Sequence, residues 1–144
     1  NTGPMEQELV RYIQDHDIRN VEMMGYKDKE ELYQMIARAT FVVVPSEWYE
    51  NYPLAIIEAF ILKKPVIGSR IGGIPELVKD GKTGLTFIPG DVEDLANKIG
   101  ELLSNFDMVS EMGKKAKMFA EETLSPQKHY EQLMEVYNMA IKGV

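Results

Sequence analysis

Glu50 and Glu58 are the two residues whose type and spacing could serve chemistry. Glu50 stands in a loop segment, and Glu58 follows eight residues later, at the second turn of an expected helix. The neighbours of Glu58 are apolar, so this helix should be largely buried, and an unpaired buried carboxylate is costly. The carboxylate of Glu58 therefore needs hydrogen-bond donors, which the hydroxyls of a nucleotide ribose would supply.

The segment between the two glutamates also offers a place for a phosphate. The first amides of the expected helix, those of Leu54 and Ala55, have no partner within a helix. With the helix dipole behind them, such amides form a natural phosphate site. Pro53 has no N–H and adds rigidity only. For the two acids taken alone, two unrelated surface residues remain the alternative, because this spacing arises often by chance.

The elements around these residues alternate between strand and helix. Residues 41–44 are apolar on both faces, which is typical of a central parallel strand covered by helices on both sides. The helix of Glu58 spans 53–62, and further strands are expected at 65–68 and 85–88. This alternation predicts an α/β fold with a Rossmann-like parallel sheet and helices on both faces. Ligands bind outside the carboxyl ends of such strands, which draws attention to the loops at 25–29, 45–52 and 69–73.

The chain on either side continues the same plan. A helix is expected at 5–17 and a short strand at 21–24, ended by Gly25. Asp28 and Glu31 have the spacing of a capping box at the start of the next helix. Asp91 caps a helix that reaches residue 103, a second helix spans 108–122, and Ser125 opens the last one. The apolar stripe of that last helix is expected to pack in the core; it comprises Tyr130, Leu133, Met134, Tyr137 and Ile141.

The composition excludes several classes of function. The chain has 144 residues, of which 44% are hydrophobic and 27% charged, as in an ordinary soluble globular protein. A net charge of −7 argues against binding nucleic acid or anionic membrane by bulk charge. The absence of cysteine excludes disulfides and thiolate metal sites, and His16 and His129 stand in no metal-ligand spacing. No apolar run is long enough to cross a bilayer, and the first residues have no signal-peptide core, so a cytoplasmic location is expected.

The two acids with seven residues between them, on a strand–loop–helix unit, resemble the E-x7-E motif of retaining GT-B glycosyltransferases of family GT4. The resemblance covers essentially the whole chain in order, so residues 1–144 are expected to form a partial C-terminal donor-binding domain, lacking its first strands. The matching segments are Pro45-Ser46, Pro53-Leu54, Glu58-Ala59, Lys64-Pro65-Val66-Ile67, Gly72-Gly73-Ile74-Pro75-Glu76, Asp80-Gly81-Lys82-Thr83-Gly84 and Pro89-Gly90-Asp91.

The resemblance implies a role for each site residue. Glu58 would bind the ribose hydroxyls of a nucleotide-sugar donor, and Glu50, the catalytic candidate, would lie beside the donor sugar and diphosphate. The other donor-binding candidates are the backbone around Asn51, Tyr52 and Leu54, for sugar hydroxyls and phosphate, and Gly25 with Tyr26, beside the base. A full-length parent would transfer a hexose from a nucleoside-diphosphate sugar to a glycan or lipid-linked acceptor. It would need no protein-bound metal or other cofactor, because positive groups and helix amides neutralise the leaving diphosphate.

The chain departs from the family pattern at a few positions. Asn51, Pro53 and Lys63 stand where many members have glycine. The family's first two strands, its donor-phosphate Arg and Lys and its acceptor domain would all precede residue 1, so the isolated chain is expected to be inactive. Any association with the inner face of a membrane would run through that absent domain. In the family the end of the chain crosses back to the same domain, so the resemblance implies that part of the apolar stripe of the last helix is exposed here. In the order 3-2-1-4-5-6, residues 21–24 would be the third strand and 41–44 the fourth. The gap between them is expected to be filled by a partner chain or an absent segment, rather than by direct pairing.

Other readings stay open on the sequence alone. The chain could be a stand-alone nucleotide-binding or interaction module without transferase activity. A GT-B-shaped epimerase of nucleotide sugars is a third reading, against which the Glu50–Glu58 motif argues. Nothing in the sequence selects between UDP, GDP and ADP. Trp48 and Tyr49 are expected to pack within their loop rather than stack on a sugar, and Gly72-Gly73 either serves a turn with positive φ or faces a ligand.

Overall fold

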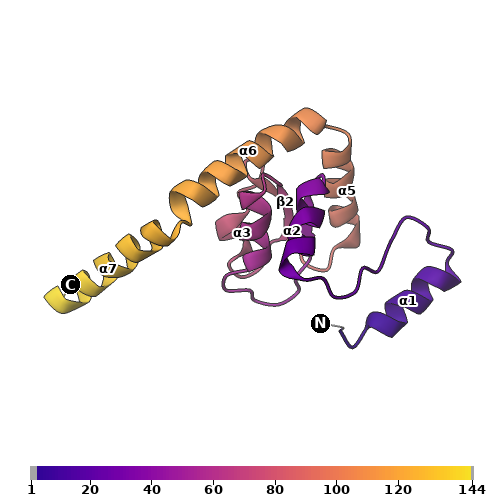
Figure 1. Cartoon of the computed structure of the whole chain (residues 1–144), viewed down its shortest axis with the longest axis horizontal. Helices are drawn as coiled ribbons and strands as arrows, with labels where there is room; N and C mark the ends of the chain where they lie inside the picture. Colours follow the sequence, from indigo (N-terminus) through magenta and orange to yellow (C-terminus); the bar gives the residue numbers. More distant parts are fainter. Residues whose placement is uncertain (1–2, 144) are drawn as a thin grey trace. The chain divides into compact units, whose positions relative to one another are not determined.

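Residues 3–143 are described by the computed structural model, and the chain divides into two units, residues 1–32 and 33–144 (Figure 1). The first unit contains α1, Glu6–Asp15, which has no buried residue. α2, Lys29–Arg38, begins in the first unit and ends in the second. Its capping box is confirmed: the amide of Glu31 donates to Asp28 Oδ1 at 2.9 Å, and the amide of Asp28 donates to Glu31 Oε2 at 3.4 Å.

The strand expected at residues 21–24 is wrong. These residues take no part in the sheet, and the side chains of Val21, Met23 and Met24 are exposed. A strand exists only where a neighbouring strand accepts and donates its ladder hydrogen bonds. An apolar run without such a neighbour stays irregular, whatever its propensity.

The second unit is built on a parallel sheet of three strands in the order β1-β2-β3. The strands are β1, Val42–Val44, β2, Val66–Ser69, and β3, Gly84–Phe87, with Val43 opposite Ile67 and Ile67 opposite Leu85. All four residues of β2 are buried, as expected for a central strand. β1 is only half-buried and, among the described residues, pairs with β2 alone. It is therefore an edge strand and not the central strand that its sequence indicates.

Helices cover both faces of this sheet, which confirms the expected α/β architecture. Alternate residues of each strand point to opposite faces. Val42, Val44 and Val66 pack against α3 and the C-terminal half of α6, whereas Val43 and Ile67 pack against α5 and the start of α6. The helices of this unit are α3, Leu54–Ile61, α4, Ile74–Leu77, α5, Val92–Leu103, α6, Phe106–Thr123, and α7, Pro126–Lys142 (Figure 1).

Side-chain caps fix where the last three helices begin. Asp91 and Ser125 cap α5 and α7 as expected, each accepting a bond from an amide three residues on. α6 begins at 106 rather than 108, because Asn105 Oδ1 accepts from the amide of Met108 at 3.0 Å. The core packing expected for the last helix is wrong: α7 has no buried residue, and its apolar stripe is exposed.

Candidate functional site

Glu50 lies in the loop that joins β1 to α3, and its side chain is half-buried. The hydroxyl of Ser46, four residues earlier in the same loop, donates to Glu50 Oε1 at 3.1 Å. This bond occupies one oxygen of the carboxylate and ties it to the start of the loop. A carboxylate has about four lone-pair positions, so capacity for a ligand remains.

Residues at and just after the end of β2 hold this loop by hydrogen bonds. Ser69, the last residue of β2, is fully buried, and its hydroxyl donates to the carbonyl oxygen of Ser46 at 2.6 Å. The amide of Gly73 donates to the carbonyl oxygen of Glu50 at 2.7 Å. The Ser46 end of this segment is therefore bonded to the last residue of β2, and the Glu50 end to the turn that follows β2.

Gly72 and Gly73 lie against the backbone of Glu50 and Asn51. Gly72 has a φ of +56°, and a Cβ on it would lie 2.7 Å from the Glu50 carbonyl oxygen and 2.8 Å from the Glu50 nitrogen. Gly73 has a φ of −78°, which any residue adopts, yet a Cβ there would collide with the carbonyl oxygen of Asn51. Gly72 thus meets the expected need for positive φ, while close approach of two backbones explains Gly73.

Glu58 lies on α3 with its side chain half-buried. The hydroxyl of Tyr33, from α2, donates to Glu58 Oε1 at 3.2 Å. Tyr33 could not be found from the sequence, because nothing in a separation of 25 residues indicates that these two side chains meet. The carboxylate thus has a partner within the chain, and one hydroxyl bond leaves a carboxylate able to accept further bonds.

The start of α3 carries no side-chain cap. Pro53 is buried at the cap position, and its carbonyl accepts from the amide of Ile56 at 3.0 Å. Tyr52 and Leu54 are 53% and 64% exposed, and Asn51 is exposed as well. The predicted donor-binding residues of this segment therefore lie together, at an accessible helix start whose first amides have no intrahelical acceptor.

Two further predictions concern aromatic residues. Trp48 and Tyr49 are 78% and 85% exposed, so the expectation that they pack within the loop is wrong. Tyr26 is also exposed, and Gly25 before it has a φ of +62°, which suits glycine. Gly25 and Tyr26 belong to the first unit, and their part in a nucleotide site stays a prediction.

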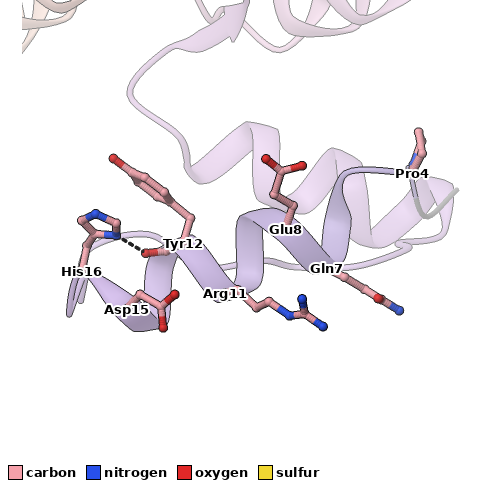
Figure 2. A pocket seen from close by; sticks show the side chains of 7 residues that line it. All are labelled: Pro4, Gln7, Glu8, Arg11, Tyr12, Asp15 and His16. Carbon is pink, nitrogen blue, oxygen red and sulfur yellow. Dashed lines mark hydrogen bonds between the residues drawn. The ribbon is translucent and has the colours of Figure 1, made fainter.

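A separate shallow pocket lies along α1 and contains none of the predicted site residues (Figure 2). The ring of His16 stacks on that of Tyr12 with centroids 4.1 Å apart, and His16 Nδ1 bonds to the Tyr12 carbonyl oxygen at 2.9 Å. One ring nitrogen of His16 is thus bonded to the backbone of the helix that His16 caps. The residues that line the pocket are Pro4, Gln7, Glu8, Arg11, Tyr12, Asp15 and His16.

Neither a metal site nor a membrane span is found in residues 3–143. Within this range no three His, Asp or Glu side chains are grouped so that they could hold a metal ion. No helix of the same range is long and apolar enough to cross a bilayer.

The sequence profile of the family described as Glycosyl transferases group 1 matches residues 2–119. The trehalose synthase of Thermococcus litoralis is 33% identical over 133 residues, which are 92% of this chain and 32% of that protein. The MMP alpha-(1->4)-mannosyltransferase of Mycolicibacterium hassiacum is 34% identical over 143 residues, which are 99% of this chain and 34% of that protein. The chain thus spans about a third of the length of the curated relatives it matches.

Solved structures also match most of this chain and about a third of their own length. The sucrose-phosphate synthase of Thermosynechococcus elongatus matches with a TM-score of 0.83 and 27% identity, over 99% of this chain and 36% of that one. HepE of Anabaena, in complex with UDP-glucose, matches with a TM-score of 0.81 and 26% identity, over 92% of this chain and 36% of that one.

Proposed function

We propose, given that this chain belongs to the glycosyl transferases group 1 family and has the C-terminal-domain fold of its GT-B enzymes, that it binds the nucleotide-sugar donor. The enzyme that contains it would be a retaining glycosyltransferase. It would transfer a hexose from a nucleoside-diphosphate sugar to a glycan or lipid-linked acceptor. Residues outside this chain, which spans a third of its relatives, would bind that acceptor.

The observation that carries the proposal is the arrangement of Glu50 and Glu58 around one uncapped helix start. Within residues 3–143 the half-buried carboxylate of Glu58 accepts one side-chain hydrogen bond, from the Tyr33 hydroxyl, so it can accept further bonds from ribose hydroxyls. Glu50 is bonded at the carbonyl and at the carboxylate, so it can present a fixed charge to the sugar. A structural neighbour, HepE, is solved with UDP-glucose bound, which supports a donor of this class.

In the proposed reaction the bond between the sugar and the diphosphate breaks and a bond between the sugar and an acceptor hydroxyl oxygen forms. Negative charge grows on the leaving diphosphate, which would take up the proton of that hydroxyl. The free amides at the start of α3, around Leu54, and the positive end of the helix dipole would stabilise that charge. Asn51 and Tyr52 would offer backbone groups to the sugar hydroxyls. We propose that these groups suffice without a protein-bound metal.

Titration of the chain with UDP, GDP and ADP by isothermal titration calorimetry tests the proposal. We expect one of the three to bind, and Glu58→Ala to weaken it by roughly ten- to a hundred-fold, as for the loss of a charge-assisted hydrogen bond. Glu93→Ala, which removes an exposed charge from the first turn of α5, is the matched control and should bind as the wild type does.

The outcomes separate the competing functions. Binding of a nucleotide that Glu58→Ala leaves unchanged would contradict the ribose role of Glu58. Failure of all three nucleotides to bind would favour an interaction module and overturn the proposal.

A further inference from the structure

We propose that Ser46, Ser69 and the Gly72–Gly73 pair form a brace that positions the Glu50 carboxylate for the donor sugar. These four residues are positioning residues: they act through Glu50 and need touch no ligand. The inference rests on the proposed function, and it adds residues that the sequence motif of two glutamates does not contain.

The first part of the brace acts on the side chain of Glu50. A glutamate on a loop loses its rotamer freedom when it binds a ligand, and that loss weakens binding. The bond of 3.1 Å from the Ser46 hydroxyl to Glu50 Oε1 removes part of that freedom beforehand. Because Ser46 and Glu50 lie in the same loop, this bond restricts the Glu50 side chain only if Ser46 is itself held in place.

Ser69 holds Ser46 in place. Ser69 is fully buried at the end of β2, the central strand, and its hydroxyl reaches the Ser46 carbonyl oxygen at 2.6 Å. The connection therefore runs from β2 through Ser69 and Ser46 to the carboxylate of Glu50. A site supported by a rigid strand is held more precisely than one on a free loop.

The glycine pair acts on the backbone of Glu50. The amide of Gly73 holds the Glu50 carbonyl at 2.7 Å, and the missing Cβ atoms of Gly72 and Gly73 let the two segments touch. At Gly73 the backbone conformation does not require glycine, because any residue adopts a φ of −78°. Glycine is required there by the close contact with Asn51, which leaves no room for a Cβ. A methyl group at 73 would push the Glu50 loop away from β2.

The brace is tested first in the chain itself, by hydrogen exchange of single amides. In Ser69→Ala we expect the amide of Gly73, which is bonded to Glu50, to exchange roughly ten-fold faster. The amide of Arg70, bonded to the Phe87 carbonyl at 2.8 Å, is the internal control and should keep its protection. Equal exchange of the Gly73 amide in variant and wild type would overturn the brace, whether or not the protein binds a nucleotide.

The second test uses sugar transfer by a full-length enzyme that contains this chain. We expect Ser46→Ala to lower kcat roughly ten-fold with little change in the donor KM, and Ser46→Thr, which keeps a hydroxyl, to restore most of it. Gly73→Ala should lower kcat at least as far. The controls are Ser104→Ala, whose hydroxyl bonds to the Gly100 carbonyl on α5, and Gly100→Ala, whose Cβ would meet nothing.

The two tests fail in different ways. A wild-type enzyme that transfers no sugar would contradict the proposed function, and the role of the brace toward a donor would fall with it. An active wild type whose Ser46→Ala and Gly73→Ala variants keep full kcat would leave the proposed function standing and overturn the brace. Loss of kcat that Ser46→Thr does not restore would also overturn the role of the hydroxyl.

Discussion

Glu58 and Glu50 differ in how the chain holds them, and this difference predicts different kinetic effects. In a full-length enzyme containing this chain, we expect Glu58→Ala to raise the donor KM roughly ten- to a hundred-fold, because a charge-assisted bond to the ribose is lost. We expect Glu50→Ala to act chiefly on kcat, since its carboxylate would lie beside the reacting sugar. Steady-state kinetics with the nucleotide sugar measure both, and an unchanged donor KM in Glu58→Ala would contradict the ribose role.

Lys63 has a left-handed backbone conformation, which suits glycine better than lysine. It has a φ of +59° and follows Leu62, the C-cap of α3. The amide of Lys63 bonds to the Phe60 carbonyl and that of Lys64 to the Ala59 carbonyl, each at 2.9 Å, which is the Schellman motif with Lys63 at the left-handed position. Glycine at this position would meet the same geometry without strain.

We expect Lys63→Gly to stabilise the fold by about 0.5–1 kcal/mol. Relief of a left-handed backbone gains about 1–2 kcal/mol, and the extra freedom of glycine in the unfolded chain offsets about 0.5–1 kcal/mol of this. Urea denaturation with an unchanged m-value measures the difference. Lys82→Gly, at an exposed turn position without positive φ, should instead destabilise; stabilisation by both variants would refute the explanation.

At the scale of elements, the packing of α6 on the end of α3 depends on Gly113. This residue is buried within α6, and a Cβ there would collide with the carbonyl oxygen of Lys63. Gly100 in α5 is exposed, and a Cβ there would meet no atom within 4 Å. The two helical glycines therefore have opposite roles.

We expect Gly113→Ala to destabilise the fold by about 1–3 kcal/mol, because α6 must move away from α3. Gly100→Ala should stabilise it by about 0.5–1 kcal/mol, since alanine is the better helix former and nothing opposes it. Thermal unfolding of both variants beside the wild type is the measurement. A Gly113→Ala protein as stable as the wild type would mean that the helices can separate at no cost.

The sequence sufficed to predict the elements whose signals are local. The cap at Asp91, the box at Asp28 and Glu31, and the strands at 65–68 and 85–88 depend on neighbouring residues, and the structure confirms them. Residues 21–24 have strand composition but no partner strand, and pairing is a property of the sheet rather than of the segment.

The candidate site divides in the same way. Glu50 and Glu58 could be found because their spacing is a recognisable pattern. Tyr33 and Ser69 could not be found. Tyr33 bonds to a residue 25 positions away and Ser69 to one 23 positions away, and nothing in the sequence near either residue indicates its partner. The Gly72–Gly73 pair could be noticed in the sequence. Its contact with the Glu50 backbone could not be predicted, because it depends on how the two segments fold against each other.

For the whole molecule, we expect the purified 144-residue chain to transfer no sugar. It spans about a third of the length of its curated relatives, so the acceptor would have to be held by residues that it does not contain. Incubation with UDP-glucose and other nucleotide sugars, followed by chromatography of the products, measures this. Sugar transfer above that of a Glu50→Ala control would contradict the expectation.

The edge position of β1 has a consequence for how the chain behaves at high concentration. Val42 donates its amide to the Pro65 carbonyl, so the amide of Val43 points away from β2, toward the side on which no strand of the described residues pairs with β1. Such an edge is a template for strand addition, and we expect the isolated chain to form concentration-dependent oligomers through it. Val43→Pro removes the outward donor without removing a β1–β2 bond, and sedimentation should show it shifted toward monomer. The same edge would accept a strand supplied within a longer polypeptide. The extent to which the isolated chain forms oligomers would then measure how strongly such a polypeptide is stabilised when that strand completes its sheet.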